Sequence, residues 1–289
     1  IKYVLDSSYG LLRGEVPIIA LRGGEVVVRE EHGSWLVDNG VMRMRVAPGF
    51  AGSVYSIELR GVEQLLTSYP QPSQLVWINP WYGGVRLASS LGRDKLCKEK
   101  WMAEEVYVEG WRGLKLHARV VSEENTELRR LEVSQYYLVR PGGSFVTLHT
   151  VLENKSGRVL KPELFLTAFV KPGGREARGL AVRHGEGVKE ARVWEYETPY
   201  LVSEHQAVVY SEAGAATLIA PPERSEVVAM SFGRSYGSHL VLVISPEQPL
   251  RPGETYELTS YLAFAASLEE ALRYAALSEL QLTLGGRRR

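Results

Sequence analysis

Apolar and polar residues alternate along many short segments of the chain, and most of these segments end near a glycine, proline or asparagine. Residues 41–46 alternate in this way before Pro48-Gly49, and residues 53–59 do so before Arg60-Gly61. Alternation with period two is typical of a β-strand that has one buried and one solvated face. Similar segments occur at residues 113–121, 128–139, 144–152, 162–170, 193–196, 207–211, 216–219, 227–232, 239–244 and 255–264. The pattern therefore predicts an all-β fold.

Turn-forming residues indicate how these strands connect. Pro141-Gly142-Gly143 lies between two strand segments and predicts a hairpin, and residues 154–157 predict a further turn. Residues 173–187 are rich in Gly, Arg and Glu, which predicts a long exposed loop. No internal repeat of 20–50 residues is visible, which argues against a propeller or a solenoid. We expect one large antiparallel β-sandwich over residues 1–266, because no polar linker divides the chain.

One segment near the end of the chain has helical spacing instead. Ser267 is a favourable N-cap, and Glu270 follows three residues later as its capping-box partner. Leu268, Leu272 and Ala275 recur at the intervals of an apolar helix face. These residues predict one short C-terminal helix over residues 267–282, packed on the sandwich.

The charge balance argues against several classes of partner. The chain carries 34 basic and 34 acidic side chains, a formal net charge of zero. It therefore lacks the basic excess typical of proteins that bind nucleic acid or an anionic membrane. No run approaches the roughly 18 apolar residues of a membrane-spanning helix. We expect no nucleic acid and no membrane among its partners.

The single cysteine, the first residue and the arginine and asparagine content give indications of where the protein is located and of its source. Cys97 is the single cysteine, which excludes an intrachain disulfide and favours a cytoplasmic location. The chain starts at Ile1, so we expect a trimmed N-terminus or a piece of a longer protein, and a removed leader stays open. Basic residues are mostly arginine and asparagine is scarce, which favours a thermophilic source.

Four short segments, which together span most of the chain, follow one another in a familiar order. They are residues 36–66, residues 69–86 with Asn79-Pro80-Trp81-Tyr82-Gly83-Gly84-Val85-Arg86, residues 150–156, and residues 250–254 before the final strand. This order resembles the galactose mutarotase-like (aldose 1-epimerase-like) supersandwich superfamily. The superfamily contains sugar epimerases, domains of glycosidases and polysaccharide lyases, and non-catalytic modules. The fold that the resemblance implies therefore does not by itself give the function.

The resemblance also implies where an acid–base pair should lie. In the family, a histidine on the strand after the third segment resembles the general acid, and a glutamate resembles the general base. In this chain that strand, residues 163–169, contains Thr167 and no histidine. A threonine hydroxyl is no general acid at neutral pH, so the chain resembles a divergent member without ordinary mutarotase activity.

Other residues could supply a rearranged acid–base pair. The candidates are His149 and His239 on strand segments and Glu195, which flanks Tyr196 together with Glu197. Paired carboxylates are what glycoside hydrolysis requires. Single histidines on strands are also typical of hydrogen-bonded structural residues, and two glutamates on one strand face are also typical of a solvated surface.

The segment around residues 77–86 carries the most distinctive chemistry. Aromatic rings stack on the apolar faces of sugars, and amide or guanidinium groups hydrogen-bond to their hydroxyls. The predicted substrate-binding residues are Asn79, Trp81, Tyr82, Arg86 and, as an extension, Trp101. The resemblance places an arginine similar to Arg86 near the concave face. The alternative is structural: the tryptophans would fill the core, and Arg86 would form an ion pair.

Three functional hypotheses follow from these features. The first is a carbohydrate-binding domain that is non-catalytic or a degenerate mutarotase, as a possible module of a larger protein. The second is an active carbohydrate epimerase or glycoside-processing enzyme with a rearranged acid–base pair. The third is a structural or protein-interaction domain. No metal-ligand spacing, phosphate loop or dinucleotide motif is present, so we expect neither a metal nor a cofactor.

Overall fold

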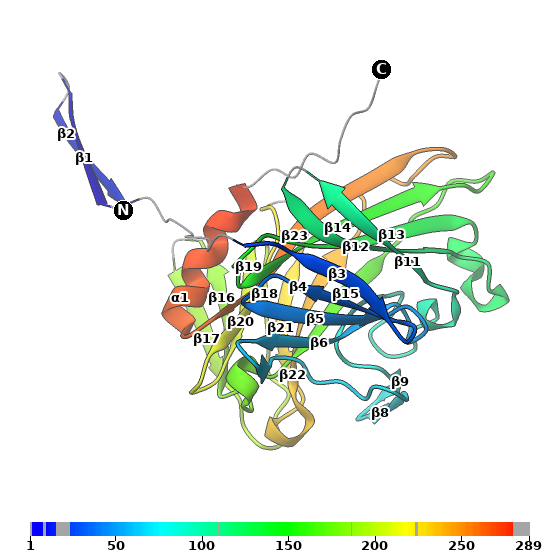
Figure 1. The fold of residues 1–289 in the computed structure, drawn as a ribbon, viewed down its shortest axis with the longest axis horizontal. Coiled ribbons are helices and arrows are strands. Elements are labelled where there is room, and N and C mark those ends of the chain that lie inside the picture. Colours follow the sequence, from blue (N-terminus) through cyan, green and yellow to red (C-terminus); the bar gives the residue numbers. More distant parts are fainter. Residues whose placement is uncertain are drawn as a thin grey trace.

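Two large antiparallel sheets packed face to face make up the body of the protein (Figure 1). The computed structural model describes residues 2–7, 10–15, 24–108, 110–185, 187–222 and 225–279. This architecture confirms the predicted antiparallel β-sandwich. No helix in these described ranges has the length and apolar character that a membrane span requires.

The first sheet contains ten of the described strands. Its order is β18 (Tyr200–Ser203), β21 (Val227–Ser231), β22 (Ser238–Ile244), β15 (Leu164–Val170), β10 (Val85–Ala88), β6 (Ser53–Leu59), β5 (Met42–Ala47), β4 (Ser34–Asp38) and β3 (Val27–Glu31), with β7 (Val62–Glu63) paired to β6.

The second sheet contains nine described strands. Its order is β11 (Met102–Val108), β12 (Trp111–Arg119), β13 (Leu131–Val139), β14 (Phe145–Asn154), β23 (Thr255–Ala265), β20 (Ala215–Ile219), β19 (Gln206–Tyr210), β16 (Gly179–His184) and β17 (Gly187–Arg192). Two separate hairpins complete the strands: β1 (Lys2–Ser7) with β2 (Gly10–Glu15), and β8 (Ser73–Leu75) with β9 (Ile78–Trp81).

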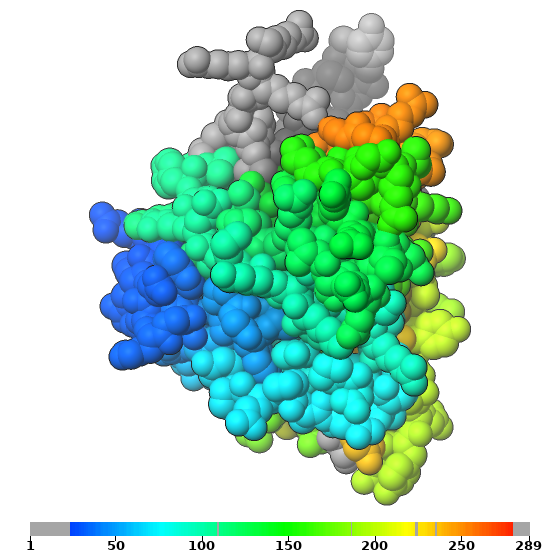
Figure 2. Space-filling view, turned by 90° about the vertical axis from the view of Figure 1, so that its right-hand side faces the viewer, coloured from blue at the N-terminus to red at the C-terminus, as the bar shows by residue number. Residues whose placement is uncertain are grey.

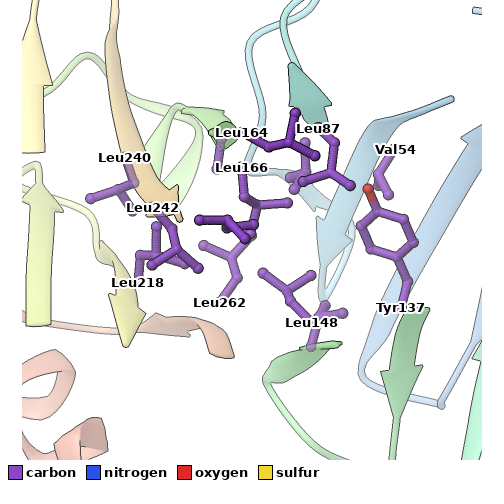
Figure 3. Packing of buried hydrophobic residues seen from close by; sticks show 14 of the residues in the cluster. Val54, Leu87, Tyr137, Leu148, Leu164, Leu166, Leu218, Leu240, Leu242 and Leu262 are labelled. Carbon is purple, nitrogen blue, oxygen red and sulfur yellow. The ribbon is translucent and has the colours of Figure 1, made fainter. Parts of the chain in front are cut away.

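The main core lies between the two sheets, where alternate side chains of facing strands meet (Figure 3). Leu87, Leu166 and Leu242 come from neighbouring strands of the first sheet, and Leu148 and Leu262 come from the second. All are almost completely buried. Side chains along a strand alternate between its two faces. The residues directly before and after each of these leucines therefore point away from the main core.

The outer face of the first sheet is also buried. Residues of β10, β15 and β22 on this face lie under the segment that contains β8, β9 and the short turn η1 (Leu96–Lys98). A small second core of Ile78, Trp81, Phe169 and Phe232 fills the space between them. Figure 2 shows part of this segment in cyan across the lower part of one face of the molecule.

A short C-terminal helix forms, but its α-helical part is shorter than the predicted residues 267–282. Helix α1 (Leu268–Arg273) continues into the turn η5 (Tyr274–Glu279), and Ser267 Oγ accepts a hydrogen bond from the Glu270 backbone N–H at 3.2 Å. Ala271, Tyr274 and Leu277 pack on the outer face of the second sheet. Residues 280–282 of the predicted helix lie outside the described residues.

Two local predictions are wrong. Residues 173–187 do not form one long loop, because β16 runs through them and buries Leu180 and Val182 between β17 and β19. The expected strand at residues 193–196 is instead part of the connection between β17 and β18, which belong to different sheets. In that connection Val193 is buried and Trp194 is exposed. The alternation of apolar and polar residues there comes from a loop that the buried Val193 holds against the core.

Asn154 joins the two sheets at the end of β14. Its buried amide Nδ2 donates to the carbonyl oxygens of Arg158 and Leu250, both at 2.8 Å, and its Oδ1 accepts from Ser156 N and Oγ. The side chain therefore holds the crossover to β15 against the turn that precedes β23.

We predict that Asn154→Ala lowers the free energy of unfolding by about 2–4 kcal/mol, because several buried polar groups lose their partners together. Urea denaturation checks this. Gln248→Ala, at an exposed position, is the control and should change stability little. An Asn154→Ala loss no larger than that of the control would contradict the role given to Asn154.

Candidate functional site

The backbone turn at Gly83 and Gly84 determines how the candidate segment enters the sheet. Both glycines have positive φ, +67° and +65°. A Cβ at Gly84 would lie 2.2 Å from the Val54 carbonyl oxygen, so only glycine fits there. The turn feeds β10 between β6 and β15 with Val85 and Leu87 in the core, which places Arg86 on the outer face.

Arg86 forms a buried ion pair with Asp94. The distance from Nη1 to Asp94 Oδ2 is 2.6 Å, and Arg86 is only 6% exposed. Asp94 also accepts hydrogen bonds from Ser89 N and Oγ and from the backbone N–H groups of Leu96 and Cys97. This carboxylate is therefore fully engaged, and the pair matches the structural alternative for Arg86.

Tyr82 and Cys97 lie beside this pair. The Arg86 guanidinium carbon lies 5.0 Å from the centre of the Tyr82 ring, and burial raises the pKa of Tyr82 to about 12. Burial and the neighbouring Asp94 carboxylate raise the pKa of the Cys97 thiol. Both groups therefore stay protonated at neutral pH, and Cys97 has none of the thiolate character of a nucleophile.

His239 lies on the same face, two strands from Arg86. Its ring stacks between Phe169 and Phe232, with centroid distances of 4.7 and 5.0 Å. Its Nδ1 is buried without a hydrogen-bond partner, and burial lowers the pKa of His239 to about 3. The imidazole is therefore neutral at physiological pH.

Thr167 separates His239 from Arg86 on this face. It lies opposite Arg86 in the register of β10 and β15, and opposite Val241 of β22. Its hydroxyl donates to the Arg86 carbonyl oxygen at 3.3 Å. The Thr167 hydroxyl is therefore engaged with the backbone of β10.

The space in front of these residues is small. A cavity of about 20 Å³ is bordered by Tyr82, Arg86, Ser90, Asp94, Thr167 and His239, together with apolar side chains. That volume holds about one water molecule and is too small for a sugar ring. Asp94 is the one carboxylate on its wall, and it is already paired, so the residues around this cavity offer no acid–base pair.

An exposed aromatic surface lies outside the small cavity. Trp77 is 53% exposed, and its ring packs edge-on against Phe232 at 5.8 Å. Gly92 lies against the indole, since a Cβ there would come within 2.9 Å of it. Asn79 is exposed and its backbone N–H donates to the Gly92 carbonyl oxygen. Trp77 and Asn79 thus present a ring and an amide to solvent on a fixed backbone.

The remaining candidate residues lie elsewhere. Trp81 is buried in the small second core, and Trp101 is buried in the main core, where its Nε1 donates to the Leu96 carbonyl oxygen at 3.2 Å. Glu195 is exposed in the connection between β17 and β18.

His149 belongs to the other sheet. It lies on β14, with Nδ1 2.8 Å from Thr259 Oγ1 and Nε2 3.7 Å from the Glu257 carboxylate. Burial lowers the pKa of His149 to about 4. The structure therefore does not bring His149 to His239. The described residues also contain no group of three or more His, Cys, Asp or Glu placed to hold a metal ion.

Sequence reasoning missed Asp94, Phe169 and Phe232. Asp94 stands in a charged run, and an acidic residue eight positions after Arg86 was the available signal for its role. The two phenylalanines belong to strand segments and give no separate signal, because only the register of β15, β21 and β22 brings them to His239.

We predict that Asp94→Asn destabilises the protein by about 3 kcal/mol or more, because the Arg86 charge then stays buried without its counter-ion. Chemical denaturation measures the loss. Glu269→Gln breaks the exposed Glu269–Arg273 pair on α1 and is the control, with no resolvable change in midpoint. Equal behaviour of the two variants would contradict a buried, structural Arg86–Asp94 pair.

We predict an acid sensitivity that depends on His239. The unfolded chain binds a proton near pH 6.5, whereas the folded chain binds it only near pH 3. Stability therefore falls as the pH drops from about 6.5 towards 3, by up to about 1.4 kcal/mol per pH unit, and this contribution does not change above that window.

His239→Phe should reduce this loss while keeping the stacking, and His149 should account for part of the remainder. Urea midpoints between pH 7 and pH 4.5 give the comparison, with the exposed His184→Gln as control. If the urea midpoint of His239→Phe fell with decreasing pH as steeply as that of the unchanged protein, His239 would not be the buried neutral group.

Comparisons with known proteins give no match by sequence and many by structure. No family model matches the chain, and no curated protein matches it. A putative aldose 1-epimerase from Klebsiella pneumoniae has a TM-score of 0.62 at 11% identity, covering 90% of this chain and 84% of that one. The galactose 1-epimerase of Lactobacillus acidophilus has a TM-score of 0.53 at 12% identity, covering 83% of this chain and 98% of that one.

A longer protein also contains this architecture. A TPR-domain protein from Parabacteroides distasonis has a TM-score of 0.61 at 13% identity over 89% of this chain, which spans half of that chain's length. The resemblance drawn from the four sequence segments is confirmed at the level of fold. The chain has the galactose mutarotase-like sandwich fold, in a sequence that has diverged far from the solved structures of that fold.

Proposed function

We propose that this domain binds carbohydrate and does not transform it. The ligand would lie over the exposed surface of Trp77 and Asn79 and reach towards the half-buried Tyr82, which borders the small cavity. Trp81, Arg86 and Trp101 would support this surface from within. The proposed partner is thus a saccharide, as expected from the aromatic segment in the sequence.

The observation that carries the proposal is the exposed indole of Trp77. About half of the Trp77 side chain stays exposed, and Phe232 and Gly92 fix the ring in place. A fixed ring loses little conformational entropy when a sugar face stacks on it. The Asn79 amide, two residues further along, is also exposed, and it can both donate and accept hydrogen bonds to sugar hydroxyls.

The described residues around the small cavity offer no suitable acid–base pair, which supports binding without catalysis. Mutarotation needs one group that gives a proton and another that takes one, both near neutral pH. His239 is neutral with a pKa of about 3, and Asp94 is held by Arg86 and four further donors. Asp94 can serve only if the buried ion pair is broken, and His239 carries no proton to donate near neutral pH.

The fold supports a sugar rather than another ligand. Proteins described as galactose 1-epimerase and putative aldose 1-epimerase share the sandwich, and their names concern sugars. Their identity to this chain is too low for their activity to be transferred. We therefore extend to this chain only the general class of ligand.

Titration calorimetry against neutral mono- and oligosaccharides tests the proposal. For a saccharide that binds, Trp77→Ala should weaken the affinity about tenfold, the effect of losing roughly 1.4 kcal/mol of stacking. Trp77→Phe keeps a ring and should lose less. Tyr107→Ala removes an aromatic side chain that is 73% exposed on β11, and should leave the affinity unchanged.

Exchange of anomers, followed by NMR in the presence of the protein, separates binding from catalysis. The expected rate equals that in buffer. A faster rate would favour an epimerase with a rearranged acid–base pair. Failure of every saccharide to bind, or equal affinity in Trp77→Ala, would overturn the proposed surface.

A further inference from the structure

A second, much larger pocket lies at the end of the sandwich where β15 and β21 finish. Its volume is about 550 Å³, within the range of small-molecule sites. It is bordered by residues around the turn η3 (Pro172–Gly174), the strand end at Arg192, the β19–β20 turn, and the turn η4 (Arg234–Tyr236). The η4 turn is the gold loop at the bottom of Figure 1.

Basic side chains dominate the wall of this pocket. They are Lys171, Arg175, Arg178, Arg192 and Arg234. The acidic side chains on the wall are Glu176 and Glu212, so the lining has an excess of three positive charges. This local excess stands out in a chain whose formal net charge is zero.

Several of these charges have no counter-ion. Glu212 pairs with Arg178, which neutralises both. Within the described part of the chain, Lys171, Arg175 and Arg234 form no ion pair. Arg192 lies over the Trp194 ring, with its guanidinium carbon 4.5 Å from the ring centre, which orients the side chain without cancelling its charge.

The backbone beneath these cations is held in place. Gly173 N donates to Gln64 Oε1 at 2.9 Å, and Ser211 Oγ donates to the Pro172 carbonyl oxygen at 2.7 Å. A Cβ at Gly173 would lie 2.5 Å from the Ala213 carbonyl oxygen, so η3 sits directly on the β19–β20 turn. The fold thus holds several positive charges around one pocket. A bound anion would offset the electrostatic repulsion between them.

The opposite side of the pocket is fixed as well. A Cβ at Gly233 would lie 2.3 Å from the Glu195 carbonyl oxygen, so the loop after β17 packs directly against the start of η4. Arg192 and Arg234 therefore come from two segments in contact. The backbone under these cations is thus in place before a ligand binds, so that only their side chains must be ordered.

We propose that this pocket is a binding site for a small polyanion, a ligand that carries two or more oxyanion groups such as phosphates or carboxylates. Arginine suits such groups because its planar guanidinium donates two parallel hydrogen bonds to one oxyanion. Four accessible cations around about 550 Å³ exceed what a single phosphate needs. Phosphorylated sugars and short uronic-acid oligosaccharides both have this chemistry.

The polyanion site is separate from the proposed sugar surface. Trp77 and Asn79 do not border the pocket, and none of the basic residues contributes to the Trp77 surface. The two proposals can therefore fail independently: a neutral saccharide reports on Trp77, and an anion without a sugar reports on the pocket.

Calorimetric titration of the whole chain with four probes tests the inference: inorganic phosphate, pyrophosphate, trigalacturonate and galactose. We expect pyrophosphate or trigalacturonate to bind at least about tenfold more tightly than phosphate, and galactose not to bind in this pocket. Raising the salt from about 0.05 to 0.5 M should weaken the binding, because the cations are exposed.

Three variants then locate the site. Arg175→Gln/Arg234→Gln should weaken polyanion binding about tenfold or more, whereas Arg119→Gln/Arg129→Gln removes the same charge at exposed positions elsewhere and should change it less than about twofold. Glu176→Gln removes an opposing carboxylate and should strengthen binding about twofold, an effect that misfolding cannot mimic.

The pattern of probes identifies the source of the ligand. Preference for pyrophosphate points to phosphate esters, and preference for trigalacturonate points to uronic acids. Absence of binding by both polyanions, or equal losses in the two double variants, would overturn the inference.

Discussion

The packing of two sheets through alternate apolar side chains is the constraint on which the rest of the structure depends. Because Val85 and Leu87 face the main core, Arg86 must point to the opposite face of the first sheet. That face is covered by the segment containing β8, β9 and η1, so the charge of Arg86 is removed from water. A buried guanidinium requires a counter-ion, and Asp94 from the covering segment supplies it. The packing of β10 in the main core and the Arg86–Asp94 ion pair thus both follow from the alternation of side chains along β10.

The same covering leaves little space over Arg86. A cavity of about 20 Å³ remains over Arg86, and the His239 ring beside it stays neutral between two phenylalanines. Opening this site for a sugar would break an ion pair in which Asp94 also accepts four other hydrogen bonds. The two proposed binding sites therefore lie on the outside of the covering segment, where Trp77 is held by Phe232, and at the end of the sandwich, where cations without a counter-ion border an open pocket.

The sequence predicted the fold better than the site, for physical reasons. Period-two alternation alone located β6 at residues 53–59, and capping residues located the start of α1. The same reasoning missed β16, because the glycines and arginines around this buried strand are typical of a loop. It also predicted a strand after β17, where buried and exposed residues alternate in a loop. Arg86 was recognised as distinctive, but its partner depends on how the chain folds back after β10. The basic pocket was not foreseen, since its residues come from four separate segments.

The six tryptophan indole N–H signals test most directly whether a saccharide binds outside the small cavity over Arg86. In a heteronuclear NMR titration with a saccharide that binds, the Trp77 signal should shift with the bound fraction. The signals of the buried Trp81, Trp101 and Trp111 should move much less. Large shifts of Trp81 and the His239 ring with an unmoved Trp77 would mean that the sugar enters the cavity over Arg86, and would contradict this account.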